Sequence, residues 1–269
     1  MNILIIGCGW LGRIVGDSLV TKGHKVFGTY RSLKSKVEIE NLGITPIEIK
    51  DNSFSQNSIN KYRHPDLVLI FLPAKRNKEA VEYSNTISNL VDYFTGDTRV
   101  IFTSSIGIYP KKSGVFNEDY EFIDEEKQSS LYKAETLLKA KFNSNLTILR
   151  LAGLIGPNRH PIKQLTGKSI QSSGDVYVHL VHSEDISRVV STIIAKNSYG
   201  NTFNLVYPIK ISKKDYYSFI ASKYNLKLPS FGKQVEAERV ISGHRIEDVL
   251  SFEYKLDIGL FNDSLEVNK

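Results

Sequence analysis

The sequence predicts an α/β protein built on a doubly wound parallel sheet, with a small C-terminal substrate lobe. Two observations carry this prediction. Short apolar runs, which have the length of buried strands, alternate with longer amphipathic stretches over the first 150 residues, as in a parallel sheet covered by helices on both faces. The first run, Asn2 to Ile6, leads directly into glycines spaced G-x-G-x-x-G. We therefore expect a strand, a tight turn and a helix start here, and about seven strands in all.

Composition narrows the class of protein. The chain has 269 residues, of which 41% are hydrophobic, enough for a substantial core. It has no run of about eighteen apolar residues and no leader-like N-terminus, so we expect a cytoplasmic protein without a membrane span. The single cysteine, Cys8, rules out an internal disulfide, and no metal site is expected. The net charge of +6 suits an anionic small molecule, but the basic residues are dispersed, so no nucleic-acid partner is predicted.

Each glycine of the turn has its own task. Gly7 makes the sharp turn, Gly9 lets the backbone approach a pyrophosphate, and Gly12 lets the next helix lie close to the strand. That helix, expected from about Leu11 to Lys22, directs its positive dipole end at the phosphates. The turn therefore predicts a dinucleotide site.

The second strand, His24 to Arg31, ends where the adenosine ribose of such a cofactor lies. A site selective for NAD usually carries an Asp or Glu here. This chain has Thr29, Tyr30, Arg31 and Ser32 instead. No carboxylate repels a 2′-phosphate, and the Arg31 guanidinium can form two hydrogen bonds to one. We expect NADP, with NAD as the less favoured cofactor, although Arg31 as a solvated loop charge is an open alternative.

The next strands add residues at the same edge of the sheet. Thr45 to Ile49 is followed by Asp51, which is either an acceptor for the adenine amino group or a turn residue. Asp66 to Leu72 is a continuous apolar run that ends in Pro73 and Ala74, small enough to border a cofactor crevice. The residues that we expect to contact the cofactor are Gly7, Gly9, Trp10, Leu11, Gly12, Thr29, Arg31, Ser32, Asp51, Leu72, Pro73, Ala74, Thr103 and Ser104.

The fifth strand, Arg99 to Thr103, runs into the stretch TSSIGIYP. With this stretch the chain resembles the extended short-chain dehydrogenase/reductase family, whose members carry S-S-x-x-x-Y-G here. The resemblance implies that Ser105 hydrogen-bonds the substrate oxygen and that Tyr109 is a structural tyrosine. The alternative is that Ser104 and Ser105 simply end a strand.

The same comparison reveals a departure. In the family a tyrosine acts as general acid/base, helped by a lysine four residues later that lowers the phenol pKa. Here the residue four positions after Tyr132 is Thr136. In the family the tyrosine lies about eight residues before a glutamate of the same helix. Counted back from Glu135, the tyrosine position falls on Lys127 and the lysine position on Leu131. Tyr132 is therefore either a catalytic residue or an ordinary half-buried helix residue.

The sixth strand, Leu146 to Leu151, opens the pattern R-L-A-G-x-x-G-P-x-R. Together with the G-C-G start, this resembles an atypical subgroup of the superfamily described as nucleoside-diphosphate-sugar epimerases of unknown substrate. The resemblance covers nearly the whole chain. It implies a Rossmann NAD(P)-binding fold with a dinucleotide-binding domain over 1–150 and a mixed C-terminal region over 151–269. It also implies contacts to the diphosphate or polar head of the substrate, unless this loop is merely solvated, from Asn158, Arg159, His160 and Lys163.

The C-terminal region has clear local signals. A strand is expected from Val176 to His182, and its two histidines, His179 and His182, point to opposite faces and so do not form a metal pair. A helix follows Ser183, and another opens with a Ser212–Asp215 capping box. Further short elements are expected within 234–240 and 244–254.

The predicted function is an NADP-dependent oxidoreductase or epimerase that acts on a small polar substrate, such as a nucleotide sugar. Its substrate is expected to be anionic, and the protein to be a monomer or homodimer. The alternative is a non-catalytic NADP-binding sensor or scaffold that has lost the Tyr/Lys pair.

Replacing Arg31 by Ala should weaken NADPH binding and leave NADH binding almost unchanged. A charge-assisted contact to phosphate contributes about 1.5 to 3 kcal/mol, which corresponds to roughly ten- to hundredfold in affinity. Dissociation constants for both cofactors at fixed ionic strength measure this, with Lys34→Ala as the matched control that should cost little. Equal affinities in the wild type, or equal losses in the variant, would contradict a role for Arg31 in reading the phosphate.

Overall fold

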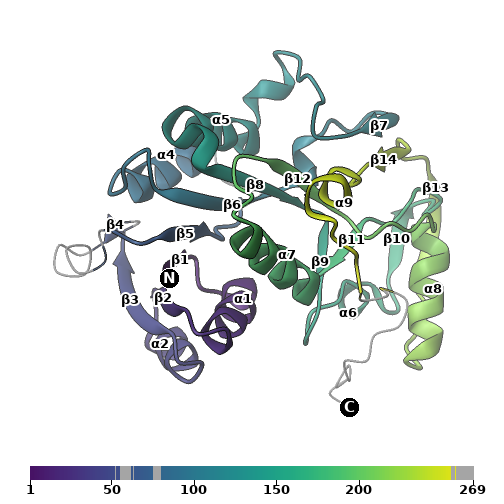
Figure 1. The fold of residues 1–269 in the computed structure, drawn as a ribbon. Helices are drawn as coiled ribbons and strands as arrows, with labels where there is room; N and C mark the ends of the chain where they lie inside the picture. The colour runs from purple at the N-terminus through teal and green to yellow at the C-terminus, as the bar shows by residue number, and fades with distance from the viewer. Residues whose placement is uncertain (52, 55–61, 63, 75–79, 256–257, 259–269) are drawn as a thin grey trace. The chain divides into compact units, whose positions relative to one another are not determined.

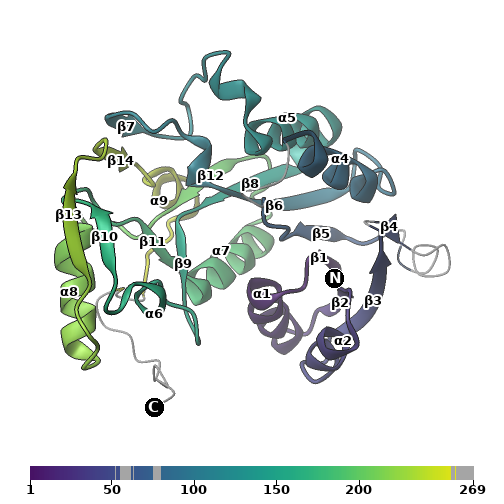
Figure 2. The same ribbon diagram turned by 180° about the vertical axis from the view of Figure 1, so that it is seen from behind.

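The structure is a computed structural model (Figures 1 and 2), and its chain divides into two compact units. The first unit contains Met1–Ile108, Glu121–Arg150 and Ser187–Phe203, and the second contains Tyr109–Tyr120, Leu151–Ile186 and Asn204–Lys269. Both units are therefore assembled from several stretches of chain. The residues that the structure describes are 1–51, 53–54, 62, 64–74, 80–255 and 258.

The main sheet confirms the predicted doubly wound fold. Among the described residues it has eight strands in the order β12-β8-β6-β5-β1-β2-β3-β4. From β1 the chain winds outward through β2 and β3 on one side and through β5, β6, β8 and β12 on the other, so the order reverses between β1 and β5. The strands are β1 (Asn2–Ile6), β2 (Lys25–Tyr30), β3 (Thr45–Lys50), β4 (Ser53–Phe54), β5 (Leu67–Ile70), β6 (Arg99–Ser105), β8 (Leu146–Leu151) and β12 (Thr202–Leu205).

The strand register explains the continuous apolar runs of the sequence. Leu4 lies opposite Phe27 of β2 and Val68 of β5, and both pairings are parallel. Leu4 and Val68 are fully buried, because helices cover both faces of the sheet. β4 runs antiparallel to its neighbour, β3.

Helices lie on both faces of this sheet. Figures 1 and 2 show α4 (Ala80–Val91) and α5 (Ser130–Phe142) on one face and α1 (Trp10–Thr21), α2 (Leu33–Glu40) and α7 (Ser183–Lys196) on the other. Serine side chains set two of the helix starts: Ser32 accepts a hydrogen bond from the Ser35 amide in α2, and Ser129 accepts one from the Tyr132 amide in α5. Short 3₁₀ turns are η1 (Ile106–Ile108), η2 (Glu126–Gln128) and η3 (Asn143–Asn145).

The second unit has its own core and short strand pairs. Its core contains Ile155, Leu180, Tyr216 and Ile220, all at most 2% exposed. Three parallel pairs are β9 (Gly153–Ile155) with β11 (Leu180–His182), β10 (Ser169–Ser172) with β13 (Ser230–Gln234), and β7 (Gly114–Phe116) with β14 (Arg239–Ile241). The helices are α6 (Ile162–Leu165), α8 (Lys213–Lys223) and α9 (Arg245–Leu250).

Two local expectations for this unit have different outcomes. The serine half of the capping box is confirmed, since the Ser212 hydroxyl accepts from the Asp215 amide at 3.0 Å, while the Asp215 carboxylate accepts from that hydroxyl at 2.7 Å. The strand expected from Val176 is shorter and begins only at Leu180. The reason is that the Val178 amide donates instead to the Ile211 carbonyl, just ahead of α8. No helix in the described part of the chain is long and apolar enough to cross a bilayer.

A buried ion pair joins α5 to β8 in the first unit. Arg150 donates through Nη2 to Glu135 Oε2 at 2.8 Å and through Nε to Oε1 at 3.1 Å, and each side chain is only 3% exposed. The guanidinium also lies over the Phe122 ring, 5.6 Å from its centroid. A paired, bidentate geometry is what makes two buried charges tolerable.

Glu135→Ala should therefore lower the free energy of unfolding by about 3 to 5 kcal/mol, because it leaves the Arg150 guanidinium buried and unpaired. The double variant Glu135→Leu/Arg150→Met should recover most of that loss. Urea titration at pH 7 measures both. The Asp92–Lys141 pair, 3.2 Å apart and exposed on its Asp92 side, supplies the control: Asp92→Asn should cost less than about 1 kcal/mol, and an equally small loss in Glu135→Ala would contradict the argument.

Candidate functional site

The glycine turn between β1 and α1 shows why each glycine is needed. Gly7 has a φ of +89°, and a Cβ there would lie 2.8 Å from the Phe71 carbonyl oxygen. A Cβ on Gly12 would lie 2.8 Å from the Gly7 carbonyl oxygen. By contrast, a Cβ on Gly9 would meet no atom within 4 Å. Gly7 and Gly12 are thus required by the packing of the protein itself, whereas Gly9 borders open space that a side chain would fill.

The start of helix α1 faces this turn without a cap. Gly9 is the N-cap residue, no side chain caps the helix, and no acidic residue lies in its first turn. The positive end of the helix dipole is therefore uncompensated by side chains, which favours an anion there. The helix begins at Trp10, one residue before the predicted start, with Trp10 half-buried and Leu11 buried. The turn and helix start fit a dinucleotide pyrophosphate.

Cys8, inside the turn, is a packing residue. A Cβ on Gly28 of β2 would lie 2.8 Å from its sulfur, so the thiol fills the space that Gly28 leaves. Burial raises the pKa of the Cys8 thiol to about 12, with the charge of Arg13 acting weakly in the opposite direction. The thiol is protonated at neutral pH and is not a reactive nucleophile.

At the end of β2 the residues divide between two roles. The Thr29 hydroxyl is buried and accepts a hydrogen bond from the Gly7 amide at 2.8 Å, so it fixes the turn. Sequence reasoning missed this contact. Ser32 caps α2, and Arg31, which lies between Thr29 and Ser32 in the sequence, is exposed. Asp51 adopts a left-handed conformation with φ +49° and is exposed just after β3, as a turn residue would be. A contact from Asp51 to adenine stays a prediction.

The ends of β5 and β6 lie at the same edge of the sheet. Leu72 borders the glycine turn, since its Cδ2 is 2.9 Å from where a Gly7 Cβ would stand, and its carbonyl accepts from the Tyr83 hydroxyl at 2.8 Å. Pro73 is exposed and Ala74 half-buried. In β6, Thr103 donates to the Ile70 carbonyl at 3.1 Å.

The next residue, Ser104, has a buried hydroxyl without a hydrogen-bond partner among the residues described. An unpaired buried hydroxyl is energetically costly, so it is a candidate for contact with a bound molecule. Its neighbour Ser105 is half-buried, and its Oγ accepts a hydrogen bond from the Gly107 amide at 3.0 Å.

The helix that should carry the Tyr/Lys pair presents a leucine to this turn. The Leu131 side chain lies 3.9 Å from where a Gly107 Cβ would stand, so the position four residues before Glu135 faces the turn after Ser105. Tyr132 is half-buried and packs against Phe122, with ring centroids 5.2 Å apart. Thr136, four residues after Tyr132, is exposed.

In the predicted substrate loop three of the four residues are exposed and one is buried. Asn158, Arg159 and Lys163 are exposed. The expectation that His160 offers a donor at the mouth of the site is wrong, because its ring is buried and both nitrogens are engaged. Nδ1 accepts from the Ile162 amide at 3.1 Å, and Nε2 lies 2.9 Å from the Tyr216 hydroxyl. Burial, with the charge of Lys163, lowers the pKa of His160 to about 4. His160 therefore fixes α6 as a neutral residue.

A cavity of about 730 Å³ lies elsewhere in the second unit, and none of the predicted site residues lines it. Its walls come from several short segments far apart in the sequence, so no local motif could have revealed it. Within the described ranges, no group of three or more His, Cys, Asp or Glu side chains could hold a metal ion.

Comparison with known proteins identifies the family. Residues 3–205 match the model of the NAD dependent epimerase/dehydratase family, and the chain belongs to that family. The Escherichia coli K12 protein named YeeZ is 28% identical over 264 residues, which cover 94% of this chain and 96% of YeeZ.

Solved structures agree with the fold. The UDP-glucuronic acid 4-epimerase of Bacillus cereus, in complex with UDP-glucuronic acid and NAD, superposes with a TM-score of 0.77 at 18% identity, covering 96% of each chain. The UDP-N-acetylglucosamine 4-epimerase of the same organism gives 0.72 at 17% identity, covering 95% of this chain and 94% of its own. At these identities the likeness shows the fold alone.

Gly9→Val should abolish binding of NADPH and NADH and leave the fold intact, because its side chain would project into open space that the pyrophosphate needs. Calorimetric titration measures binding, and circular dichroism with thermal unfolding measures folding. Gly12→Val is the matched control, and it should lower the melting temperature because its Cβ would clash with the backbone at Gly7. Undiminished cofactor binding in Gly9→Val would show that the turn holds no dinucleotide.

Proposed function

We propose that the protein is an NADP-dependent oxidoreductase or epimerase whose substrate is a nucleotide sugar or a similar small anion. The observation that carries the proposal is the glycine turn, where the open position at Gly9 meets the uncapped start of α1. Membership of an NAD-dependent family supports a nicotinamide cofactor. The UDP-sugar epimerases with the same fold support the substrate class.

The preference for NADP rests on the end of β2. Residues 29–32 carry no carboxylate that would repel a 2′-phosphate, and Arg31 is exposed beside the Ser32 cap of α2. Guanidinium groups bind phosphate oxygens in pairs, so Arg31 is the proposed phosphate contact. Asn158, Arg159 and Lys163 are the proposed contacts of the anionic part of the substrate.

Ser105 is the proposed group that polarises the substrate oxygen. Its Oγ already accepts from the Gly107 amide, so its own proton can be donated to a substrate oxygen. The nicotinamide, when bound, supplies hydride transfer. The orphaned Ser104 hydroxyl is a second proposed contact, one residue earlier in the strand.

A second candidate function has an observation of its own. Leu131, an apolar residue, occupies the position that faces the turn after Ser105, and Tyr132 has the exposed Thr136 where the family has a lysine. A chain that binds NADP but lacks the family's tyrosine and lysine as a proton donor would act as a sensor or scaffold. Cofactor binding combined with no turnover of any nucleotide sugar would favour this second function.

Ser105→Ala should lower turnover by roughly two orders of magnitude, as loss of a polarising donor does, whereas Tyr132→Phe should change it little. Both variants are assayed on the nucleotide sugar that the wild type turns over fastest, with NADPH affinity measured in parallel to confirm an intact cofactor site. A large loss in Tyr132→Phe beside a silent Ser105→Ala would reverse the assignment.

A further inference from the structure

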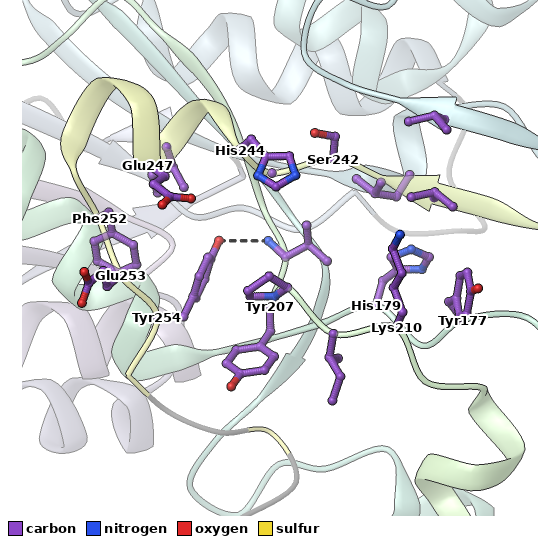
Figure 3. A pocket seen from close by; sticks show the side chains of 18 residues that line it. Tyr177, His179, Tyr207, Lys210, Ser242, His244, Glu247, Phe252, Glu253 and Tyr254 are labelled. Atoms are coloured by element: carbon purple, nitrogen blue, oxygen red, sulfur yellow. Dashed lines mark hydrogen bonds between the residues drawn. The ribbon is translucent and has the colours of Figure 1, made fainter.

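The cavity in the second unit is a separate site from the glycine turn. Its lining residues all belong to the second unit, and its volume of about 730 Å³ is that of a small-molecule pocket. Figure 3 shows Tyr177, His179 and Lys210 on one side of the cavity and Glu247, Phe252, Glu253 and Tyr254 on the other, with Tyr207 and His244 between them. The two ends therefore differ in charge.

One end combines Tyr177, His179 and Lys210 (Figure 3). Burial, followed by the charges of Arg239 and Lys213, lowers the pKa of His179 to about 4, so its ring is neutral at pH 7. The side chains of Tyr177, His179 and Lys210 have no hydrogen-bond or ion-pair partner in the described part of the chain. Uncommitted donors beside positive charge favour an anion at this end.

The positive charges behind this end are only partly neutralised. Lys213 pairs with Glu236 at 2.6 Å. Arg239 is half-buried, donates to the Tyr109 carbonyl at 3.3 Å, and has its pKa lowered by burial. In these contacts Glu236 is the one carboxylate beside two cations, Lys213 and Arg239. The net positive charge near His179 therefore favours a negatively charged group of a ligand.

The other end has the opposite character. Phe252 and Tyr254 lie edge to face with centroids 5.3 Å apart, and Tyr254 and Tyr207 with centroids 5.9 Å apart. The Tyr254 hydroxyl is held by the Val206 amide at 3.2 Å (Figure 3), which fixes the ring. The exposed carboxylates of Glu247 and Glu253 line the cavity beside these rings. Fixed aromatic rings next to carboxylates favour an organic cation.

We propose that this cavity binds a zwitterionic small molecule, with its carboxylate at Lys210 and His179, its ammonium group at Glu247 and the tyrosines, and an apolar or ring-shaped body between them. The aliphatic and aromatic lining accounts for the body. Charges of opposite sign at the two ends exclude a simple anion or a simple cation as the preferred occupant. The site is independent of the proposed cofactor site, because it uses none of the same residues.

The test uses three rigid compounds that differ only in their charged ends. 4-(Aminomethyl)benzoate carries both charges, 4-methylbenzoate only the negative one, and 4-methylbenzylamine only the positive one. Calorimetric titration of the full chain at pH 7.5 should show saturable binding of 4-(aminomethyl)benzoate at one site, with a Kd at least about tenfold lower than for either single-charge compound. Absence of saturable binding, or equal affinity for all three, would overturn the proposal.

Charge-removing variants locate the two ends. Lys210→Gln should weaken 4-(aminomethyl)benzoate about tenfold and leave 4-methylbenzylamine unchanged, and Glu247→Gln should weaken it equally and leave 4-methylbenzoate unchanged. Both side chains are exposed, so neither variant should unfold. Lys168→Gln and Asp248→Asn are matched controls, exposed in the same unit but outside the cavity lining.

The outcomes separate this site from the cofactor site. NADPH affinity should be the same in all four variants, so failure of NADP binding would leave this result standing. If the control variants weaken the compound as much as Lys210→Gln and Glu247→Gln do, binding is a nonspecific effect of surface charge and the proposal is wrong.

Discussion

The buried pair between Glu135 and Arg150 is the interaction on which the first unit depends. It ties α5 to β8 through two hydrogen bonds where neither charge reaches solvent, and Phe122 covers the guanidinium. The pair also affects α4, because burial and then the Glu135 charge raise the pKa of Tyr83 in that helix. The helix so fixed carries Leu131 and Tyr132, so the geometry beside Ser105 follows from this pair.

Most of the main sheet could be predicted because its signals are local. β8 has the predicted bounds, although Arg150 interrupts its apolar run, because four of its six residues are apolar and the charge is neutralised within the fold. The short strands of the second unit could not be predicted in the same way. β7 pairs with β14 more than a hundred residues later, and three-residue strands show no periodicity of their own.

In the candidate site, too, the features set by local sequence could be predicted and those set by distant partners could not. The roles of Gly7, Gly9 and Gly12 follow from backbone geometry within one turn, which the sequence displays directly. The Thr29 contact follows from the register of β1 against β2, and the burial of His160 follows from Tyr216, 56 residues further along the chain. A polar sequence pattern gives no sign of such partners, because tertiary packing decides which histidine is buried.

Cofactor binding and proton transfer are separable in this chain. The glycine turn and the start of α1 are built from backbone and small side chains around Gly7, Gly9 and Gly12, and neither needs a catalytic tyrosine. A serine hydroxyl such as Ser105 can stabilise a developing negative charge through its hydrogen bond, but it is too weak an acid to release a proton at neutral pH. With Leu131 facing the turn, the role that we propose for Ser105 is to orient and polarise a substrate oxygen. Loss of the proton donor would lower the rate of the chemistry rather than the affinity for the cofactor, because the two depend on different residues.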